Sequence, residues 1–186
     1  MNEENREVVI NIVGQNVALG PVIRDLLPLY TRWMNDFAVV TTLGVVPSPV
    51  TLERETEWFN SSTSNNQERQ FTIYVRENML PIGNAALKDI DFRLQRAEFG
   101  ILIGEKECWN KGYGTEVANL LLDYGFNAMG LHSIYLAVLS NNPGAIRAYE
   151  KAGFKVAGRL REAIRVGQEF HDMIYMDCLA SEFKNP

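Results

Sequence analysis

Residues 103–115 read Ile-Gly-Glu-Lys-Glu-Cys-Trp-Asn-Lys-Gly-Tyr-Gly-Thr, and this stretch is the most informative in the chain. Its apolar start and its paired glycines, Gly112 and Gly114, predict the end of a strand, a loop and the first turn of a helix. Glycine lets backbone N–H groups turn toward one point without a Cβ in the way. The free N–H groups and the dipole of a helix start attract phosphate. The stretch therefore favours a phosphate-binding loop; a helix start that merely tolerates glycine is the alternative.

Two common phosphate-binding patterns do not fit this loop. A dinucleotide fingerprint needs a third glycine and an acid about 20 residues further on. Position 117 is Val, and no Asp or Glu occurs between Asp123 and Glu150. A Walker A loop needs Gly-Lys-Ser/Thr after a spacer, which the sequence lacks. Neither pattern therefore identifies a ligand for the loop, and the helix start that merely tolerates glycine stays an alternative.

A second strand-to-helix unit follows an apolar strand at 133–139. Residues 142–154 read Asn-Pro-Gly-Ala-Ile-Arg-Ala-Tyr-Glu-Lys-Ala-Gly-Phe. Together the two segments resemble the GNAT superfamily of acyl-CoA N-acyltransferases. Gly112 and Gly114 match its Arg/Gln-x-x-Gly-x-Gly/Ala loop, although Trp109 stands at the Arg/Gln position. The run WNKGYGTE is similar to the branch containing ribosomal-protein and spermidine N-acetyltransferases. The residues that match the second signature are Asn142, Ala145, Ile146, Tyr149, Gly153 and Phe154.

Composition excludes several function classes. The chain has 186 residues, 46% of them hydrophobic and 22% charged, which predicts one globular domain over residues 1–186. A net charge of −5 argues against a nucleic-acid partner. Two cysteines and two histidines give no metal-ligand cluster, so no metal is expected. No apolar run is long enough to span a membrane, and the acidic start is unlike a secretory signal, so we expect a cytoplasmic protein.

The hydrophobic pattern predicts an α+β fold in one domain. Its elements are a mixed, mostly antiparallel sheet with flanking helices and one central βαβ crossover. The expected strands are 8–13, 17–19, 71–76, 79–89, 96–103, 133–139, 155–166 and 169–180. The expected helices are 21–35 with a kink at Pro28, 51–60 capped by Thr51, 114–129 and 145–152, with an apolar loop at 37–49.

The resemblance implies an acetyl-CoA site between two splayed parallel strands, 98–103 and 134–139. Exposed backbone of the first strand would bind the pantetheine arm, as in strand addition by a peptide. Gly100 would ease that approach. Lys106, Lys111 or Arg147 would assist at the 3′-phosphate; a solvated surface charge is the alternative for each. The expected donor-binding residues are Ile101, Leu102, Ile103, Asn110, Lys111, Gly112, Tyr113, Gly114, Thr115, Asn142 and Arg147.

Two residues are candidates for proton transfer. Strand alternation places Glu98 on the same side as Gly100, and the resemblance implies that Glu98 is the base or positions the amine. It also implies that Tyr149 protonates the departing thiolate. An ion pair at the sheet rim is the alternative for Glu98, and a core aromatic near Ile146 and Phe154 is the alternative for Tyr149. No covalent role is expected for Cys108.

The acceptor site is the least defined. Trp33 and Asp36 could hold a cation by ring and carboxylate, while a core position is the alternative for Trp33. The apolar residues of the 37–49 loop would cover a pocket or form a homodimer contact. The resemblance places the hairpin residues 161–172 at the amine pocket. We expect an N-acetyltransferase acting by direct attack in a ternary complex, on a protein N-terminal amine first, then a polyamine or an aminated antibiotic. A non-catalytic CoA-binding sensor module is the alternative.

Overall fold

A single sheet organises the chain. The computed structural model describes residues 8–184, and within them eight strands form one sheet in the order β1-β2-β3-β4-β5-β6-β8-β7. The strands are β1 (Ile12–Val13), β2 (Val17–Pro21), β3 (Arg69–Val75), β4 (Leu80–Asp91), β5 (Arg96–Ile103), β6 (Ser133–Leu139), β7 (Lys155–Val166) and β8 (Glu169–Leu179). The helices are α1 (Leu27–Asn35), α2 (Phe37–Val40), α3 (Leu52–Ser64), α4 (Tyr113–Asp123) and α5 (Pro143–Ala152), with short turns η1 (Arg24–Leu26), η2 (Thr41–Leu43), η3 (Lys106–Cys108) and η4 (Tyr124–Ala128). The α+β class expected from the sequence is confirmed.

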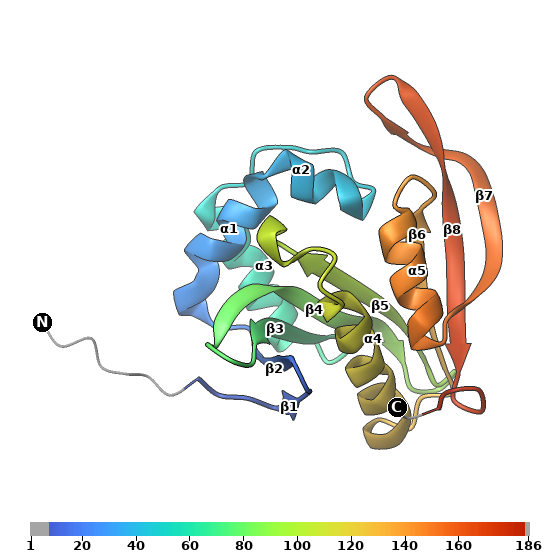
Figure 1. Ribbon diagram of the computed structural model, residues 1–186. Helices are drawn as coiled ribbons and strands as arrows, with labels where there is room; N and C mark the ends of the chain where they lie inside the picture. The colour runs from blue at the N-terminus through green and yellow to red at the C-terminus, as the bar shows by residue number, and fades with distance from the viewer. Residues whose placement is uncertain (1–7, 185–186) are drawn as a thin grey trace, which may run out of the picture.

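The centre of the sheet holds its one parallel pair. β5 and β6 pair through Arg96–Ser133, Ala97–Ile134 and Glu98–Tyr135, and the pairing ends there in the described chain. β5 remains bonded to β4 as far as Ile103, and β6 remains bonded to β8 as far as Leu139. The two strands therefore part after Glu98, and Figure 1 shows them diverging toward the end near α2. The splayed pair is confirmed.

The sheet has a helical layer on each face (Figure 1). α4 and α5 pack on the side to which β5 directs Ala97 and Phe99, both nearly fully buried in the larger core. α1 and α3 cover the other side, around a smaller core that includes Tyr30 and Trp33. The Tyr30 hydroxyl bonds Thr72 Oγ1 of β3 at 2.5 Å and ties this layer to the sheet. Successive residues of β5 thus face two different environments.

Local capping explains where several helices begin and end. Thr51 accepts a hydrogen bond from Arg54 N at 3.3 Å and starts α3, as predicted. Asn142 accepts one from Ala145 N at 3.1 Å and starts α5. Gly153 ends α5 with a φ of 104°, a left-handed conformation that suits glycine.

Several predicted elements differ from the structure. Pro28 does not kink a long helix: it lies in the first turn of α1, where its missing N–H costs nothing. The expected loop at 37–49 contains α2 and η2 because Asp36 caps a short helix, accepting from Ala38 N at 3.0 Å. α3 continues past the expected end at residue 60 to Ser64. The first strand is shorter than the expected 8–13, because β1 comprises only Ile12–Val13.

Residues 1–7 and 185–186 lie outside the described residues, and they include the acidic start that we interpreted as unlike a secretory signal. None of the helices within residues 8–184 has both the length and the apolar character that crossing a bilayer requires.

Candidate active site

A cleft of about 570 Å³ opens where β5 and β6 part. Its walls come from the second half of β5, from β6, from the start of α4 and from α5. Beyond Glu98, the facing edges of β5 and β6 do not pair with each other in the described chain, so their backbone groups can bond a ligand. The shape suits a thin, extended molecule that lies along the edge of a strand.

The start of α4 closes one end of this cleft. Gly112 precedes the helix with a φ of 85°, and no heavy atom lies within 4 Å of the Cβ that it lacks. The N–H groups of the first helical turn are therefore open to an anion. Glu116 lies in the same turn but points away, because its carboxylate accepts from Asn16 N at 2.8 Å and from Val17 N at 3.3 Å. The turn therefore stays favourable for a diphosphate.

Trp109, which departs from the Arg/Gln of the family pattern, has a structural task here. Its indole Nε1 donates to the Ile103 carbonyl oxygen at 2.8 Å. That bond occupies the last carbonyl of β5 and anchors the loop before α4 to the strand. Ile103 lines the cleft, but its carbonyl oxygen is already paired.

Tyr149 projects into the cleft from α5. Its ring contacts Phe99 edge-on at 5.8 Å and Phe154 at 6.0 Å. The hydroxyl makes no hydrogen bond with residues 8–184, and burial raises the pKa of Tyr149 to about 12. The group therefore keeps its proton at neutral pH and can donate it to an atom in the cleft. Both roles considered for Tyr149, a packed aromatic and a donor, fit this position.

Glu98 lies where the strands part. Its carboxylate pairs with Lys88 Nζ of β4 at 2.9 Å, and both side chains line the cleft. The Glu98 side chain is 24% exposed. The rim ion pair considered from the sequence is therefore present, and the carboxylate is also within the cleft.

A smaller pocket of about 220 Å³ lies on the α1–α3 side of the sheet. It shares Leu43, Gly100 and Ile101 with the larger cleft. A Cβ on Gly100 would approach only Lys88 Cε, at 3.4 Å, so a bulky side chain at this position would fill the junction between the two pockets. The residues that line the smaller pocket are Met34, Leu43, Glu55, Trp58, Gln70, Asn84, Ala85, Ala86, Gly100, Ile101 and Leu102.

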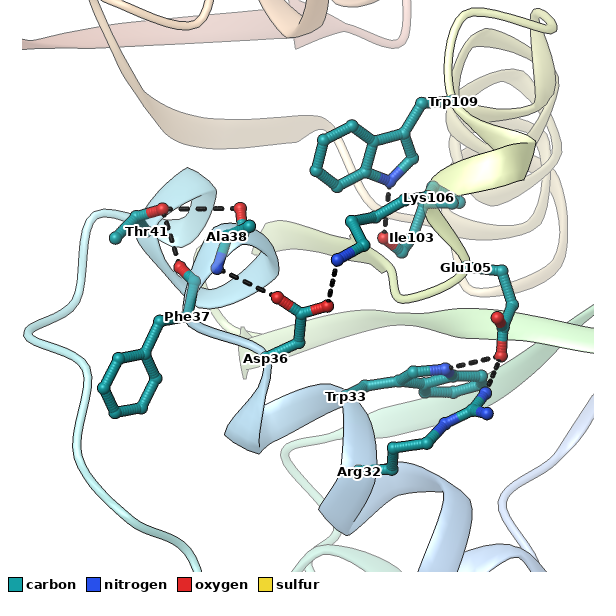
Figure 2. A network of polar contacts seen from close by, with 10 residues as sticks. All are labelled: Arg32, Trp33, Asp36, Phe37, Ala38, Thr41, Ile103, Glu105, Lys106 and Trp109. Carbon is teal, nitrogen blue, oxygen red and sulfur yellow. Dashed lines mark hydrogen bonds and ion pairs between the residues drawn. The ribbon is translucent and has the colours of Figure 1, made fainter.

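Trp33 and Asp36 line neither pocket. Trp33 is 1% exposed, and Gly104 makes room for it, since a Cβ there would lie 2.2 Å from the indole. Figure 2 shows its Nε1 donating to Glu105 (2.9 Å), which also pairs with Arg32. Asp36 pairs with Lys106 Nζ at 2.5 Å, and that bond lowers the pKa of the Asp36 carboxyl. Both residues attach α1 and α2 to the loop before α4, so we do not carry them into the proposal as acceptor ligands.

The structure brings most expected donor-binding residues together. Those that line the cleft are Ile101, Ile103, Asn110, Gly112, Tyr113, Gly114, Thr115, Asn142 and Arg147. Leu102 lines the smaller pocket instead because its side chain points to the opposite face, and Lys111 lies outside both linings. Lys106 is paired with Asp36 and is not free for a phosphate.

The outcome for the acceptor-side predictions is mixed. Leu43 and Val45 of the apolar loop line the cleft, as one interpretation of that loop had it. No residue of the β7–β8 hairpin lines either pocket within the described chain, contrary to its expected place at the amine site. Glu55 was also missed. Its sequence signal is an acid that shares the buried face of α3 with Trp58 and Ser62.

A parted parallel pair, a glycine-started helix at its open end and a tyrosine in the cleft define an acyl-CoA-dependent acyltransferase. The comparisons with known proteins agree. Residues 16–155 match the family model described as an acetyltransferase (GNAT) domain. The chain belongs to the GNAT acetyltransferase family.

Its relatives include spermidine acetyltransferases. The spermidine N(1)-acetyltransferase of Vibrio cholerae is 35% identical over 129 residues, which cover 69% of this chain and 73% of that protein. The Escherichia coli K12 enzyme of the same name is 29% identical over 163 residues, covering 88% and 86%. A crystal structure of spermidine N-acetyltransferase from V. cholerae in complex with CoA and spermine has a TM-score of 0.84 at 28% identity, covering 91% of this chain and 98% of that one. This chain is an acetyl-CoA-dependent N-acetyltransferase, and the sensor alternative is not retained.

Proposed function

We propose that this enzyme transfers the acetyl group of acetyl-CoA to a primary amine of a polyamine such as spermidine. The observation that carries the proposal is the junction of the two pockets at Leu43, Gly100 and Ile101. A donor in the larger cleft and an amine in the smaller pocket would meet there. The same proposal treats residues 1–186 as one acyltransferase domain, with the family match over 16–155 as support.

Polyamines take precedence over protein N-terminal amines, which reverses the order expected from the sequence. The relatives from V. cholerae and E. coli are named for spermidine, and the similar crystal structure holds spermine. The smaller pocket has a volume of about 220 Å³, which suits a slender alkyl amine better than a peptide backbone with its side chains.

Different residues at the junction would act in different steps of the transfer. The amine nitrogen attacks the thioester carbonyl carbon, and Glu98 accepts or relays the proton that the nitrogen loses. Backbone N–H groups near Ile101 bond the carbonyl oxygen as it gains charge. The carbon–sulfur bond then breaks, Tyr149 donates a hydrogen bond to the sulfur, and solvent protonates the free thiolate. Asn142, Gly112 and Gly114 would hold the donor, with Arg147 at its outer end.

An acceptor panel tests the proposal. Free-thiol release from acetyl-CoA is measured with spermidine, spermine, an N-terminal peptide and an aminoglycoside. We expect the highest kcat/KM with a polyamine. A kcat/KM for the peptide or the aminoglycoside that is tenfold above that for spermidine would overturn the proposal. Glu98→Gln should lower kcat by about 10²-fold or more if the carboxylate takes the proton. Glu77→Gln, in the exposed β3–β4 turn, is the matched control.

A further inference from the structure

A buried carboxyl group without a partner lies in the smaller pocket. Glu55, on α3, is 7% exposed and lines that pocket. Its side chain makes no hydrogen bond or ion pair with residues 8–184; burial raises the pKa of its carboxyl, and the positive charge of Arg54 partly opposes that rise. Burying a charge without a partner is unfavourable to folding. Stability therefore does not explain this residue.

The groups beside Glu55 suit a cation on an alkyl chain. Trp58 follows one helical turn later and lines the same pocket, offering an aromatic face. Asn84 lines it too; its buried Nδ2 has no hydrogen bond in the described chain, but as an N–H donor it cannot bond an ammonium group. The Tyr30 hydroxyl beside the pocket bonds Thr72 Oγ1 and accepts from Ile23 N at 3.4 Å, so neither bond involves Asn84 Nδ2. Of the Glu55 and Asn84 side chains, the Glu55 carboxylate is the one that can accept hydrogen bonds from a cation.

The position of Glu55 separates it from the site of acetyl transfer. The pocket floor crosses three neighbouring strands, from Gln70 on β3 through β4 to Gly100 on β5. Adjacent strands lie about 4.8 Å apart, so the floor is on the order of 10 Å wide. α3 packs against β3, and Glu55 lies close enough to Tyr30 to affect its pKa. The junction with the donor cleft is at the β5 side, where Glu98 and Gly100 lie.

We propose that Glu55 binds a second ammonium group of the acceptor, one that does not react, while the reacting nitrogen lies at the junction beside Glu98. This inference rests on the proposed polyamine acetylation and deepens it. The enzyme would then bind two nitrogens of its acceptor that are separated by a few methylene groups. Diamines and polyamines have a second ammonium group that can pair with the Glu55 carboxylate. Monoamines of the same length lack that group and leave the carboxylate unpaired in the pocket.

Glu55→Gln tests this role because it keeps the size of the side chain and removes its charge. We expect the KM for spermidine to rise about tenfold or more, the loss typical of a buried charge-assisted bond. The KM for acetyl-CoA should stay within twofold. With butylamine, which lacks a second nitrogen, kcat/KM should also stay within twofold. Glu57 is an exposed acid on the same helix, so Glu57→Gln is the matched control. It should leave kcat/KM unchanged for both spermidine and butylamine.

Unfolding measurements separate binding from a structural role. At neutral pH, Glu55→Gln should melt at the same temperature as the wild type or higher, because an unpaired buried charge is removed. Spermidine should raise the melting temperature of the wild type and of Glu57→Gln, but not that of Glu55→Gln. If Glu55→Gln melts at a lower temperature but has an unchanged KM for spermidine, the inference is overturned. It is also overturned if the variant loses kcat/KM equally with butylamine and with spermidine.

The two proposals fail differently. If the wild type acetylates no polyamine, the proposed function fails. If it acetylates spermidine and Glu55→Gln does so with the same KM, the proposed function stands and only the role of Glu55 is refuted.

Discussion

Replacing Tyr149 with phenylalanine removes one hydroxyl from the donor cleft and keeps the packing of the ring. The contacts with Phe99 at 5.8 Å and Phe154 at 6.0 Å do not involve the hydroxyl. That hydroxyl has no hydrogen-bond partner among residues 8–184, so Tyr149→Phe should fold with unchanged or slightly greater stability. Any loss of activity then belongs to the chemical step.

The raised pKa decides how large that loss should be. A simple thiol has a pKa of about 8.5, whereas that of Tyr149 is about 12. Complete proton transfer from tyrosine to thiolate would be uphill by roughly 3–4 pKa units, or about 5 kcal/mol. We therefore expect a hydrogen bond to the departing sulfur rather than a completed transfer. A bond to a charged group contributes about 1.5–3 kcal/mol, which predicts a fall in kcat of about 10- to 150-fold.

The assay is free-thiol release with both substrates saturating. Tyr175→Phe, on the exposed face of β8, is the matched control and should retain full kcat. The folded-state pKa of Tyr149 is raised, so its contribution to stability is complete below pH 10 and is lost as the pH rises toward about 12. Tyr149→Phe should lack that loss. A fall in kcat of less than threefold, with a normal unfolding curve, would refute the role given to the hydroxyl.

Three further substitutions test the walls of the cleft. Gly112→Ala forces a Cβ into a φ of 85°, which should cost about 1–3 kcal/mol in the free energy of unfolding and raise the KM for acetyl-CoA; an unchanged denaturant midpoint would contradict this. Trp109→Phe keeps an aromatic ring but removes the bond to the Ile103 carbonyl; chemical denaturation should show a loss of about 1 kcal/mol, and a gain would show that the bond does not hold the loop. Cys108→Ala should retain kcat, because burial raises the pKa of that thiol and leaves it a poor nucleophile; loss of thiol release in this variant would reopen a covalent route.

Local interactions were predictable because neighbouring residues make them. Thr51 and Asn142 cap helices through amides three residues away, and Gly153 ends α5 by its own backbone conformation. The strand alternation that placed Glu98 beside Gly100 likewise depends only on the period of an extended chain. From such signals the α+β class, the helix start after Gly112 and the side of β5 on which Glu98 lies could be predicted, whereas the donor-binding role of 110–115 and the role of Tyr149 were predicted from the family resemblance.

Tertiary structure decided what depends on residues far apart in the chain. In the sequence, Trp33 is an aromatic residue at helical spacing. In the structure its indole donates to Glu105, 72 positions away, and so attaches α1 to the loop before α4. Lys106 is a plausible phosphate ligand until Asp36 pairs with it. Glu55 has the sequence context of an ordinary acid in the first turns of a helix. Its place in a pocket arises because residues of β3, β4, β5, α1 and α3 come together around it, and no short segment of sequence encodes that arrangement.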